Sequence, residues 1–554
     1  MTRATTRILA AELLIALAFT LLALLVRLPE LQQIPRFTDE TGQVQTALSI
    51  LRQGARPLVD DDPNRGVFWA YLLATSLAIF GAQPALPRLF ACVLGALTVG
   101  ATYGLGRARA GRLAGGVAAL GMTTAFSHVA LNSHVAWSNS STPLWTTLAV
   151  LCTYLAAKAP QETSSMVPRD LALLGAGLMW GLALHTHLSV LPMIAGAVFW
   201  WLADRERRAR LKTPAPYAAV AVFLVVLSPM IVFNLQSMAA HQGLASVRDA
   251  LGPSQPIARD HGPAAIAGNA IQLAGQLGRA AGAGPLVEPG DPTPGGFGGV
   301  LVRATDALRP FATVAYALLL FGALAYAALR GSRLLAAVAG TAVMVLPFVN
   351  RAYTGFYDTR YIAFLLPLGY VALAEVVAVV SVGAGRANAI SIGNGQPLDS
   401  PQSVQERQWQ PWKRRVWIAL FGLMVAYPLA SLGAYYAREN AAGRTNRPIW
   451  VTESRLVQAN TPSSPILIDK AMRKIKHGGG GDPARAFDEL LALADVPHQI
   501  VDEAKMRWFL VNDPKTAYRL IAADATAAVL MGEFKLASRE EGDGWVVLER
   551  AGQP

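Results

Sequence analysis

Apolar stretches of about 15 to 22 residues recur along most of the chain, with polar stretches between them. A helix that crosses a bilayer needs about 17 to 25 mostly apolar residues. Eleven stretches reach or approach this length, and they lie at about 8–27, 89–106, 113–131, 143–157, 171–185, 188–203, 215–233, 311–329, 334–349, 361–382 and 416–436. The pattern predicts a polytopic α-helical membrane protein with about 11 transmembrane helices.

A further apolar run, 67–82, is short and carries Trp69 and Tyr71 near its start, so it fits either a span or a helix on the membrane surface. Lys and Arg favour the cytoplasmic loops of membrane proteins. If 67–82 lies on the surface, the basic residues of the short loops fall on one side, and they are Arg107, Arg109, Arg112, Lys158, Arg169, Arg205, Arg207, Arg208, Arg210, Lys212, Arg330, Arg333, Lys413, Arg414 and Arg415. The opposite loops 128–142 and 185–188 contain none. We therefore predict a multi-pass plasma-membrane protein with a cytoplasmic N-terminus and an extracytoplasmic C-terminal domain.

This topology divides the chain into a transmembrane domain, 1–436, and an extracytoplasmic domain, 437–554. Two long outer segments of the first domain are the loop 28–88, which holds the surface helices, and the loop 234–308. The second loop is rich in Gly and Pro, which suggests a mobile cover over a site or disorder. On the cytoplasmic side, 383–412 has the composition of a flexible linker.

The extracytoplasmic domain mixes short strand-like and helical patterns, which predicts a small α/β fold. The strand-like runs are 466–468, 508–511, 528–531 and 545–548, and the helical patterns lie near 484–494 and 515–522. The glycine run 478–481 lacks the spacing and the Lys-Ser/Thr of a phosphate-binding loop, so we interpret it as a linker.

Composition narrows the classes of function. Hydrophobic residues make up 53% and charged residues 15% of the chain, as expected for a polytopic membrane protein. The formal net charge of +12 is explained by the basic cytoplasmic loops and gives no reason to expect nucleic-acid binding. Cys92 and Cys152 both lie in apolar stretches, so neither a disulfide framework nor a cysteine metal cluster is expected.

Two adjacent carboxylates, Asp39 and Glu40, follow the first span on the outer side. Thr38 is a candidate N-cap and Gly54 a candidate stop for a helix whose apolar face is formed by Val44, Ala47, Leu48 and Leu51. The helix dipole would stabilise both carboxylates in their ionised form, as suits a proton acceptor. Acidic residues are also common in first turns for dipole reasons alone, so a capping role is the alternative.

Arginines stand near these carboxylates on the outer side. Arg88 marks the outer end of the second span, and Arg360 precedes the tenth span together with Tyr357 and Asp358. A guanidinium grips phosphate oxygens through its planar fork, so these arginines are candidates for binding an anionic, membrane-anchored substrate. The alternative is that each extends to the lipid headgroups, which is common for an arginine at the end of a span.

Arg65 is a further candidate for phosphate binding, just ahead of the surface helix. The acidic run 60–62 before it is typical of a solvated turn ahead of Pro63. Four histidines also lie near outer span ends, at His128, His134, His185 and His187. Their spacing without an acidic ligand is a weak metal signal, so His128 and His134 are interpreted as polar helix ends or substrate contacts.

Taken in order, these features resemble the GT-C membrane glycosyltransferases, in particular the branch of protein O-mannosyltransferases and aminoarabinose transferases. The resemblance covers about 1–436, and it depends on the first span, the acidic pair, the surface helix, Pro87-Arg88-Leu89-Phe90, the glycine-containing span 94–99, the basic loop 106–109 and the segment 359–368.

The resemblance implies an inverting transfer of a sugar from a polyprenyl-phosphate donor to a hydroxyl group on the outer side of the membrane. Asp39 matches the catalytic base and Glu40 its neighbour, and Arg88 matches an arginine associated with the donor phosphate. Arg65 and Arg360 match less specific basic positions. The acceptor hydroxyl belongs to a protein, a lipid or a glycan. No cofactor is implied, because the donor arrives already activated, although a divalent metal is not excluded.

This sequence departs from the family at two points. The His-Pro-Pro or Lys-Pro-Pro that often precedes the surface helix is replaced by Asn64-Arg65-Gly66, so details of substrate binding are not carried over. The Trp-Trp-Asp motif of oligosaccharyltransferases is absent, which disfavours that branch and its metal requirement.

Two other functions remain open from the sequence. A transporter or flippase of an anionic lipid or sugar would place its ionisable groups at the membrane midplane within repeated halves. Here the charges lie at the outer face, and no repeat is evident. An inactive scaffold of the same fold is the third interpretation, and the intact pair Asp39 and Glu40 argues against it.

Overall fold

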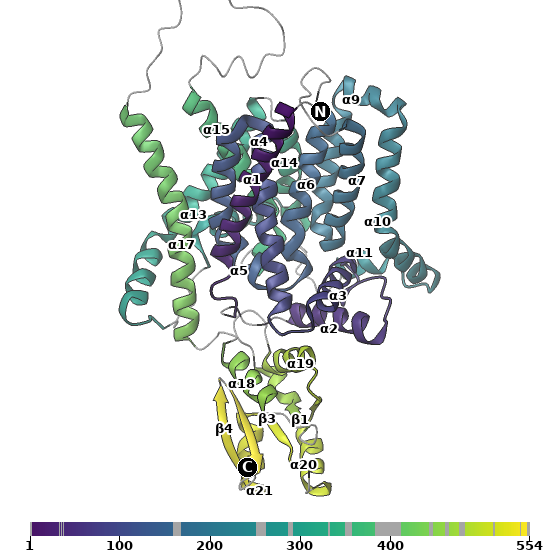
Figure 1. Ribbon diagram of the computed structural model, residues 1–554, viewed down its shortest axis with the longest axis vertical. Helices are drawn as coiled ribbons and strands as arrows, with labels where there is room; N and C mark the ends of the chain where they lie inside the picture. The colour runs from purple at the N-terminus through teal and green to yellow at the C-terminus, as the bar shows by residue number, and fades with distance from the viewer. Residues whose placement is uncertain are drawn as a thin grey trace, which may run out of the picture.

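The computed structural model describes residues 3–32, 34, 36, 38–158, 168–250, 262–285, 292–330, 333–349, 357–382, 411–442, 447–459, 465–475, 482–513, 516–542 and 544–550. A bundle of long helices carries a small mixed domain at one end (Figure 1). The main helices of the bundle are α1 (Arg3–Arg27), α4 (Leu86–Thr124), α5 (Phe126–His134), α6 (Thr142–Ala157), α7 (Arg169–Thr186), α8 (Leu191–Leu202), α10 (Pro214–Ala239), α12 (Pro263–Gly278), α13 (Gly296–Leu329), α14 (Arg333–Val349), α15 (Leu365–Val382) and α17 (Pro411–Ala441).

Each of the eleven apolar stretches lies on one or two of these helices. By length and composition, five helices of the described chain can cross a membrane, or up to six if α8 and the bent segment after it are counted as one span. The membrane class of the fold follows from these helices, whereas the number of eleven spans stays a prediction. One difference is in α4, which joins two predicted spans across non-helical backbone at Ala110 and Gly111.

The long outer loop predicted at 234–308 is largely helical where the structure describes it. Helix α10 continues to Ala239, α11 (Ala245–Ala250) and α12 follow, and α13 begins at Gly296. The described residues of this loop are therefore mostly helical, and its role as a mobile cover stays a prediction. The Ala-rich sequence of α12 favours a helix in spite of its glycines, because alanine has the highest helix propensity.

Two short helices, α2 (Thr38–Gln53) and α3 (Phe68–Phe80), lie at the end of the bundle next to the C-terminal domain (Figure 1). The N-terminus and α9 (Arg205–Ala209) lie at the opposite end. This agrees with the separation of basic loops from α2 that the charge pattern predicted. Helix α3 is too short to span a bilayer, as expected for the surface helix 67–82. Which end faces outward stays a prediction.

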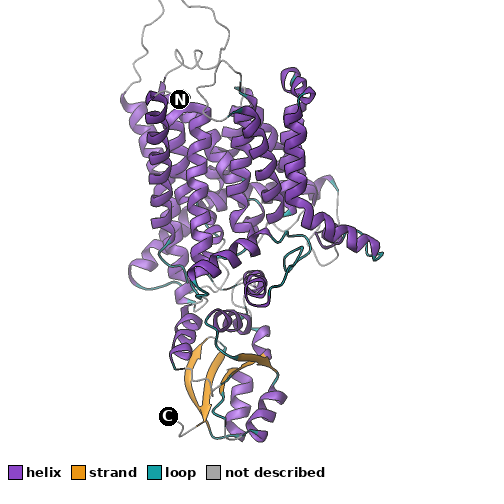
Figure 2. Ribbon diagram, turned by 45° about the vertical axis from the view of Figure 1, so that its right-hand side comes forward, coloured by secondary structure: helices purple, strands orange, loops and turns teal. Residues whose placement is uncertain are grey.

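The C-terminal domain contains a five-stranded sheet of order β2-β1-β3-β5-β4. Strands β1 (Ile466–Asp469), β2 (His498–Val501) and β3 (Arg519–Ala523) are parallel, and β5 (Trp545–Arg550) runs antiparallel to β3 and β4 (Leu536–Gly542). Helices cover both faces of the sheet (Figure 2). One apolar cluster contains residues of α18 (Arg447–Gln458) and α19 (Pro483–Leu493). A second cluster contains residues of α20 (Glu503–Asn512) and α21 (Asp524–Glu533).

The α/β class of this domain agrees with the prediction, but several elements differ. Strands were predicted at 508–511 and 528–531, where the structure has α20 and α21, and a helix at 515–522, where it has β3. Short apolar runs do not distinguish a strand from a buried helix. The missed signal for α20 is Asp502, whose side chain accepts a hydrogen bond from the Lys505 N–H and caps the helix. The glycine run 478–481 lies outside the described residues.

Candidate active site

Helix α2 presents its first turn to the base of the bundle, and this turn carries Asp39 and Glu40. The helix ends at Gln53, and Gly54 follows with a φ of 65°, as predicted for a glycine stop. The side chain of Thr38 lies outside the described residues, so its capping role stays a prediction. Although the two carboxylates are adjacent in sequence, their surroundings differ.

Asp39 lies between two arginines from distant parts of the chain. Its Oδ2 is 3.4 Å from Arg65 Nη1 and 3.4 Å from Arg360 Nη2. The Asp39 side chain retains 32% of its exposure, so an incoming molecule can reach it. Burial opposes ionisation, but the two guanidinium groups outweigh it and hold the pKa of Asp39 below its usual value. The carboxylate is therefore ionised at neutral pH.

Arg65 is held by a tight acidic turn that the sequence suggested would be solvated. The turn is closed by an isolated bridge between Val59 and Gly66, and Arg65 Nη2 donates to Asp61 Oδ1 at 3.1 Å and also to Asp62. Asp60 is 7% exposed. The prediction of a solvated turn was therefore wrong for Asp60, because the turn packs against α2.

The surroundings of this turn fix its position. The Gly66 N–H donates to the backbone oxygen of His185 at 2.8 Å, which joins the turn to the end of α7. A Cβ added at Gly66 would lie 1.8 Å from His185 Nδ1, so only glycine fits. A second contact, from Ser246 Oγ to the Pro63 oxygen, joins the turn to α11 at the other side.

The pKa values in the turn are raised rather than lowered. Burial, with the neighbouring carboxylates, raises the pKa of Asp60 to about 6 and that of Asp61 to about 7, in spite of Arg65. The same carboxylates raise the pKa of Arg65, against the effect of burial. Arg65 thus stays charged while its acidic neighbours compete for it.

Arg360 reaches Asp39 from η6 (Tyr357–Tyr361), a 3-10 turn ahead of α15. Its guanidinium carbon lies 4.7 Å from the ring centre of Trp137 and 4.6 Å from that of Tyr361. Cation–π contacts of this kind hold a guanidinium in place without neutralising it. The Tyr361 ring in turn lies 4.9 Å from the ring of His187.

Glu40 is fully buried and fully bonded, in contrast with Asp39. Both of its carboxylate oxygens accept from Arg88, with Nε to Oε1 at 2.8 Å and Nη2 to Oε2 at 2.9 Å. Oε1 also accepts from the Ala136 N–H at 3.1 Å and lies 3.7 Å from Arg36 Nη1. Burial works against ionisation, but Arg88 and Arg36 lower the pKa of Glu40.

Arg88 was predicted to bind the donor phosphate, and the structure places it away from solvent. Its side chain is 0% exposed, and besides Glu40 it donates to the backbone oxygens of Leu31 and Ile34 at 2.9 and 2.7 Å. These bonds join α4 to α2 and to the segment before it. The phosphate role of Arg88 stays a prediction, but its contacts favour a role in holding α2.

His128 and His134 form part of a buried joint between helices. His128 Nδ1 lies 2.8 Å from Arg27 Nη2, and His134 lies 2.5 Å from the Arg27 oxygen through Nε2 and 2.8 Å from the Tyr436 hydroxyl through Nδ1. Both histidines are 0% exposed. The structure thus brings neither to Asp39, and its contacts favour the interpretation as polar helix ends.

The remaining candidates from the sequence are Tyr357, Asp358 and a metal site. Asp358 is partly buried in the same turn as Arg360, whereas the side chain of Tyr357 lies outside the described residues. No group of three or more His, Cys, Asp and Glu side chains in the described chain is arranged to hold a metal ion. Metal dependence stays a prediction. The sequence missed Trp137 as a support of Arg360, because nothing in the sequence links the loop 135–141 to position 360.

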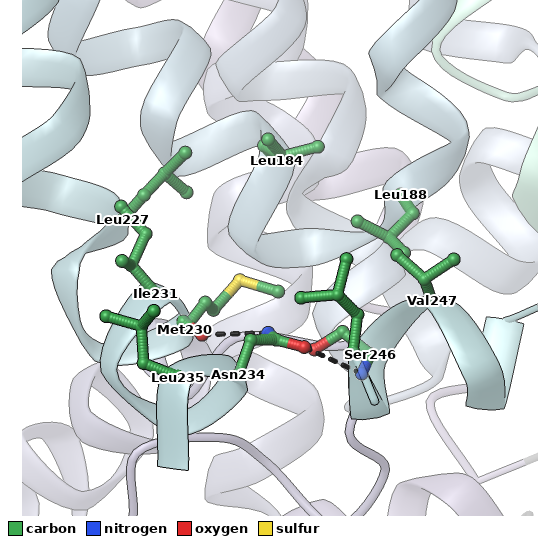
Figure 3. Close-up of a pocket in the computed structure, with 10 residues that line it drawn as sticks. Leu184, Leu188, Leu227, Met230, Ile231, Asn234, Leu235, Ser246 and Val247 are labelled. Atoms are coloured by element: carbon green, nitrogen blue, oxygen red, sulfur yellow. Dashed lines mark hydrogen bonds between the residues drawn. The ribbon is translucent and has the colours of Figure 1, made fainter. Parts of the chain in front are cut away.

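An apolar cavity of about 310 Å³ opens between α7, α10 and α11 (Figure 3). It is lined by Leu184, Leu188, Leu227, Met230, Ile231, Asn234, Leu235, Leu244, Ser246 and Val247, from α7, α10, α11 and the segment after α7. Asn234 and Ser246 bond to each other within it, and Ser246 also bonds to Pro63. Ser246 thus connects the lining of the cavity to the turn that carries Arg65.

The comparisons with known proteins agree with this architecture. Residues 64–233 match the family described as dolichyl-phosphate-mannose-protein mannosyltransferase. This stretch contains Arg65, Arg88 and His187, whereas Asp39 and Arg360 lie outside it. No curated protein sequence matches the chain.

Two solved structures of ArnT from Cupriavidus metallidurans share the fold along nearly the whole chain. The structure bound to undecaprenyl phosphate gives a TM-score of 0.56 at 14% identity and covers 97% of this chain and 98% of that one. The apo structure gives 0.52 at 12% identity, with 99% and 98% covered. The chain is thus similar to GT-C membrane glycosyltransferases: to protein mannosyltransferases in the sequence of residues 64–233, and to ArnT in fold. None of these similarities supports the transporter alternative.

Proposed function

We propose that the chain transfers a sugar from a polyprenyl-phosphate donor to a hydroxyl acceptor at the outer face of the membrane, with inversion at the anomeric carbon. The observation that carries the proposal is the position of Asp39, ionised and partly exposed between Arg65 and Arg360. A carboxylate that accepts the hydroxyl proton and arginines that bind the phosphate are the groups this reaction needs.

The arginines have two tasks in succession. Without donor they pair with Asp39, which lowers its pKa and makes it a weak base. When the donor phosphate binds, Arg65 and Arg360 form ion pairs with it and interact less strongly with Asp39. The basicity of Asp39 therefore rises. As the acceptor oxygen bonds to the anomeric carbon, its proton passes to Asp39 and the polyprenyl phosphate leaves with the bonding electrons. The arginines stabilise the negative charge that develops on the leaving phosphate.

The apolar cavity suits the lipid part of such a donor. Its wall is aliphatic except for Asn234 and Ser246, and Ile231, Leu235 and Val247 are exposed by 38, 58 and 43%. A prenyl chain that enters from the bilayer would place its phosphate near the turn of Arg65, because Ser246 bonds to Pro63 in that turn. The solved ArnT complex with undecaprenyl phosphate supports a polyprenyl phosphate as the donor class.

The proposal assigns no resident cofactor, since the donor is already activated. The acceptor is a hydroxyl of a protein, lipid or glycan. The C-terminal domain lies at the same end of the bundle as α2, the helix that carries Asp39 (Figure 1), so that domain can approach an acceptor bound at the site.

The test is the variant Asp39→Asn, assayed in membrane vesicles supplied with labelled polyprenyl-phosphate mannose or aminoarabinose and a metal chelator. We expect the rate of sugar transfer to fall by about 100- to 10,000-fold, as for loss of a general base. Asp170→Asn is the matched control, because Asp170 lies at the start of α7 and is 70% exposed. Equal transfer by wild type and Asp39→Asn would exclude Asp39 as the base.

A further inference from the structure

The C-terminal domain contacts the helix that carries Asp39. Helix α19 packs on α2 through hydrogen bonds along its length, with Gln45 Nε2 to Asp488 Oδ2 at 3.2 Å and Arg52 Nη1 to the Ala492 oxygen at 2.7 Å. Leu493 belongs to the same apolar cluster as Val44 of α2. The domain is thus packed against the site instead of being tethered at a distance.

A buried chain of alternating charges runs through this contact. Arg36 Nη1 donates to Glu489 of α19 and lies 3.7 Å from Glu40 Oε1, which in turn accepts from Arg88. All four side chains are 0% exposed. Two carboxylates and two guanidinium groups alternate along this chain, and burial raises the pKa of Glu489 to about 7 in spite of Arg36.

We propose that Glu489 is a positioning residue of the active site, through which the C-terminal domain holds the first turn of α2 in its productive place. This inference rests on the proposed function, because the position that has to be held is that of Asp39, the proposed base, between Arg65 and Arg360. Glu489 acts through Arg36 and Glu40 and does not touch the substrate.

The reason is the balance of charge around Arg36. With Glu489 present, Arg36 has a close partner on α19, and both oxygens of Glu40 remain with Arg88. Without Glu489, the nearest carboxylate for Arg36 is Glu40, 3.7 Å away. A buried guanidinium without its partner is costly, so Arg36 pulls Glu40 toward itself and away from Arg88.

A shift of Glu40 would reach both sides of the reaction site. Asp39 is the preceding residue in the same helical turn. Glu40 Oε1 also accepts from the Ala136 N–H, and the next residue, Trp137, supports the guanidinium of Arg360. One displaced carboxylate thus moves the proposed base and one of its two arginines together.

The test compares Glu489→Gln with Glu503→Gln, a matched change on α20 whose side chain is 43% exposed and pairs with Arg507. For Glu489→Gln we expect the maximal rate of sugar transfer to fall by about 100-fold, since a displacement of about 1 Å has that effect on catalysis. The KM for the polyprenyl-phosphate sugar should change less than the rate, because Arg65 is untouched and only Arg360 shifts with Trp137. A wild-type rate in Glu489→Gln would overturn the proposal.

A double variant separates positioning from general damage to the fold. In Arg36→Met with Glu489→Met both charges are gone and Glu40 keeps Arg88, so we expect the transfer rate to return to within a few-fold of wild type. If the single variant does not fold, this double variant decides alone. A folded double variant with the rate of Glu489→Gln, or no activity, would overturn the proposal.

Hydrogen exchange distinguishes failure of this inference from failure of the proposed function. If the wild-type protein transfers no sugar, the proposed function falls, but α2 can still be followed through the amides of residues 38–53. We expect faster exchange there in Glu489→Gln than in Glu503→Gln. Equal exchange in the two variants would refute the positioning role whatever the reaction is.

Discussion

The first turn of α2 has an open side and a closed side, and they differ in what their charges can do. The open side consists of Asp39, Asp61, Arg65 and Arg360. There the Asp39 side chain is 32% exposed and forms ion pairs of 3.4 Å with Arg65 and Arg360. On the closed side Arg36, Glu40, Arg88 and Glu489 are 0% exposed, and Arg88 bonds to Glu40 at 2.8 and 2.9 Å. Asp39 and Arg360, with side chains 32% and 17% exposed, are the charges that a substrate can reach on the open side, whereas Arg65 is 5% exposed and is held by Asp61 and Asp62. The buried, saturated charges of the closed side hold the backbone that presents Asp39.

The largest effect on stability should come from Glu40→Gln on the closed side. The change leaves Arg88 and Arg36 facing a neutral amide, and breaking a buried ion pair on one side costs about 3 to 5 kcal/mol. Asp39→Asn, by contrast, should change the free energy of unfolding by less than about 1 kcal/mol, because Asp39 is partly exposed. Thermal unfolding in detergent measures both variants.

The comparison predicts opposite profiles for these two variants. Glu40→Gln lowers the Tm strongly, whereas Asp39→Asn abolishes transfer at nearly unchanged Tm. If Glu40→Gln kept the wild-type Tm and lost only transfer, the division into a holding and a reacting side would be wrong.

A middle-sized effect is expected from Gly66→Ala on the open side. The new methyl group would lie 1.8 Å from His185 Nδ1, and such overpacking costs about 1 to 3 kcal/mol. Because Arg65 is the neighbouring residue, the transfer rate should fall by about ten-fold or more together with the Tm. Gly268→Ala is the control, since no atom lies within 4 Å of the added Cβ. Wild-type activity in Gly66→Ala would show that the turn tolerates displacement.

The smallest effect concerns the pH dependence of stability through Asp61. Burial, with Asp60, Asp62 and Asp39, raises the pKa of Asp61 from 3.8 to about 7 in spite of Arg65. The folded protein therefore binds the proton more tightly than the unfolded chain, so this group's contribution is fully present below pH 3.8 and is lost as the pH rises through 7. Asp61→Asn removes this loss.

We expect Asp61→Asn to raise the Tm at pH 8 by about 2 to 4 °C, for a gain of about 1 kcal/mol. The advantage should shrink when the pH is lowered to 5, which a series of unfolding curves at different pH values measures. A constant difference between variant and wild type at all pH values would show that Asp61 does not titrate in this range.

The sequence was sufficient for the elements whose cause is local. The surface helix that begins at Thr38 and stops before Gly54, the helix at 68–80 and the strand at 466–469 all follow from periodicity and glycine placement. The candidate site was also predicted in part, since Asp39, Arg65 and Arg360 are brought together.

The rest depended on contacts between residues far apart in the chain. Arg88 carries the same guanidinium as the partly exposed Arg360, and only its bonds to Glu40, Leu31 and Ile34 show that Arg88 is buried and saturated. Glu489 carried no signal at all, because its partner Arg36 lies 453 positions earlier. Periodicity reports on neighbours within a turn or two, and it cannot rank one arginine against another.

The separation between Arg36 and Glu489 also has a consequence for biosynthesis. A ribosome makes the proposed base long before it makes the carboxylate that completes its support, because Glu489 lies 453 positions after Arg36. The N-terminal helices can therefore enter the membrane long before that support exists. If the contact is needed for the reaction, a nascent chain that has not yet formed α19 inserts without acting on the donor lipid, and only chains that carry α19 consume the donor.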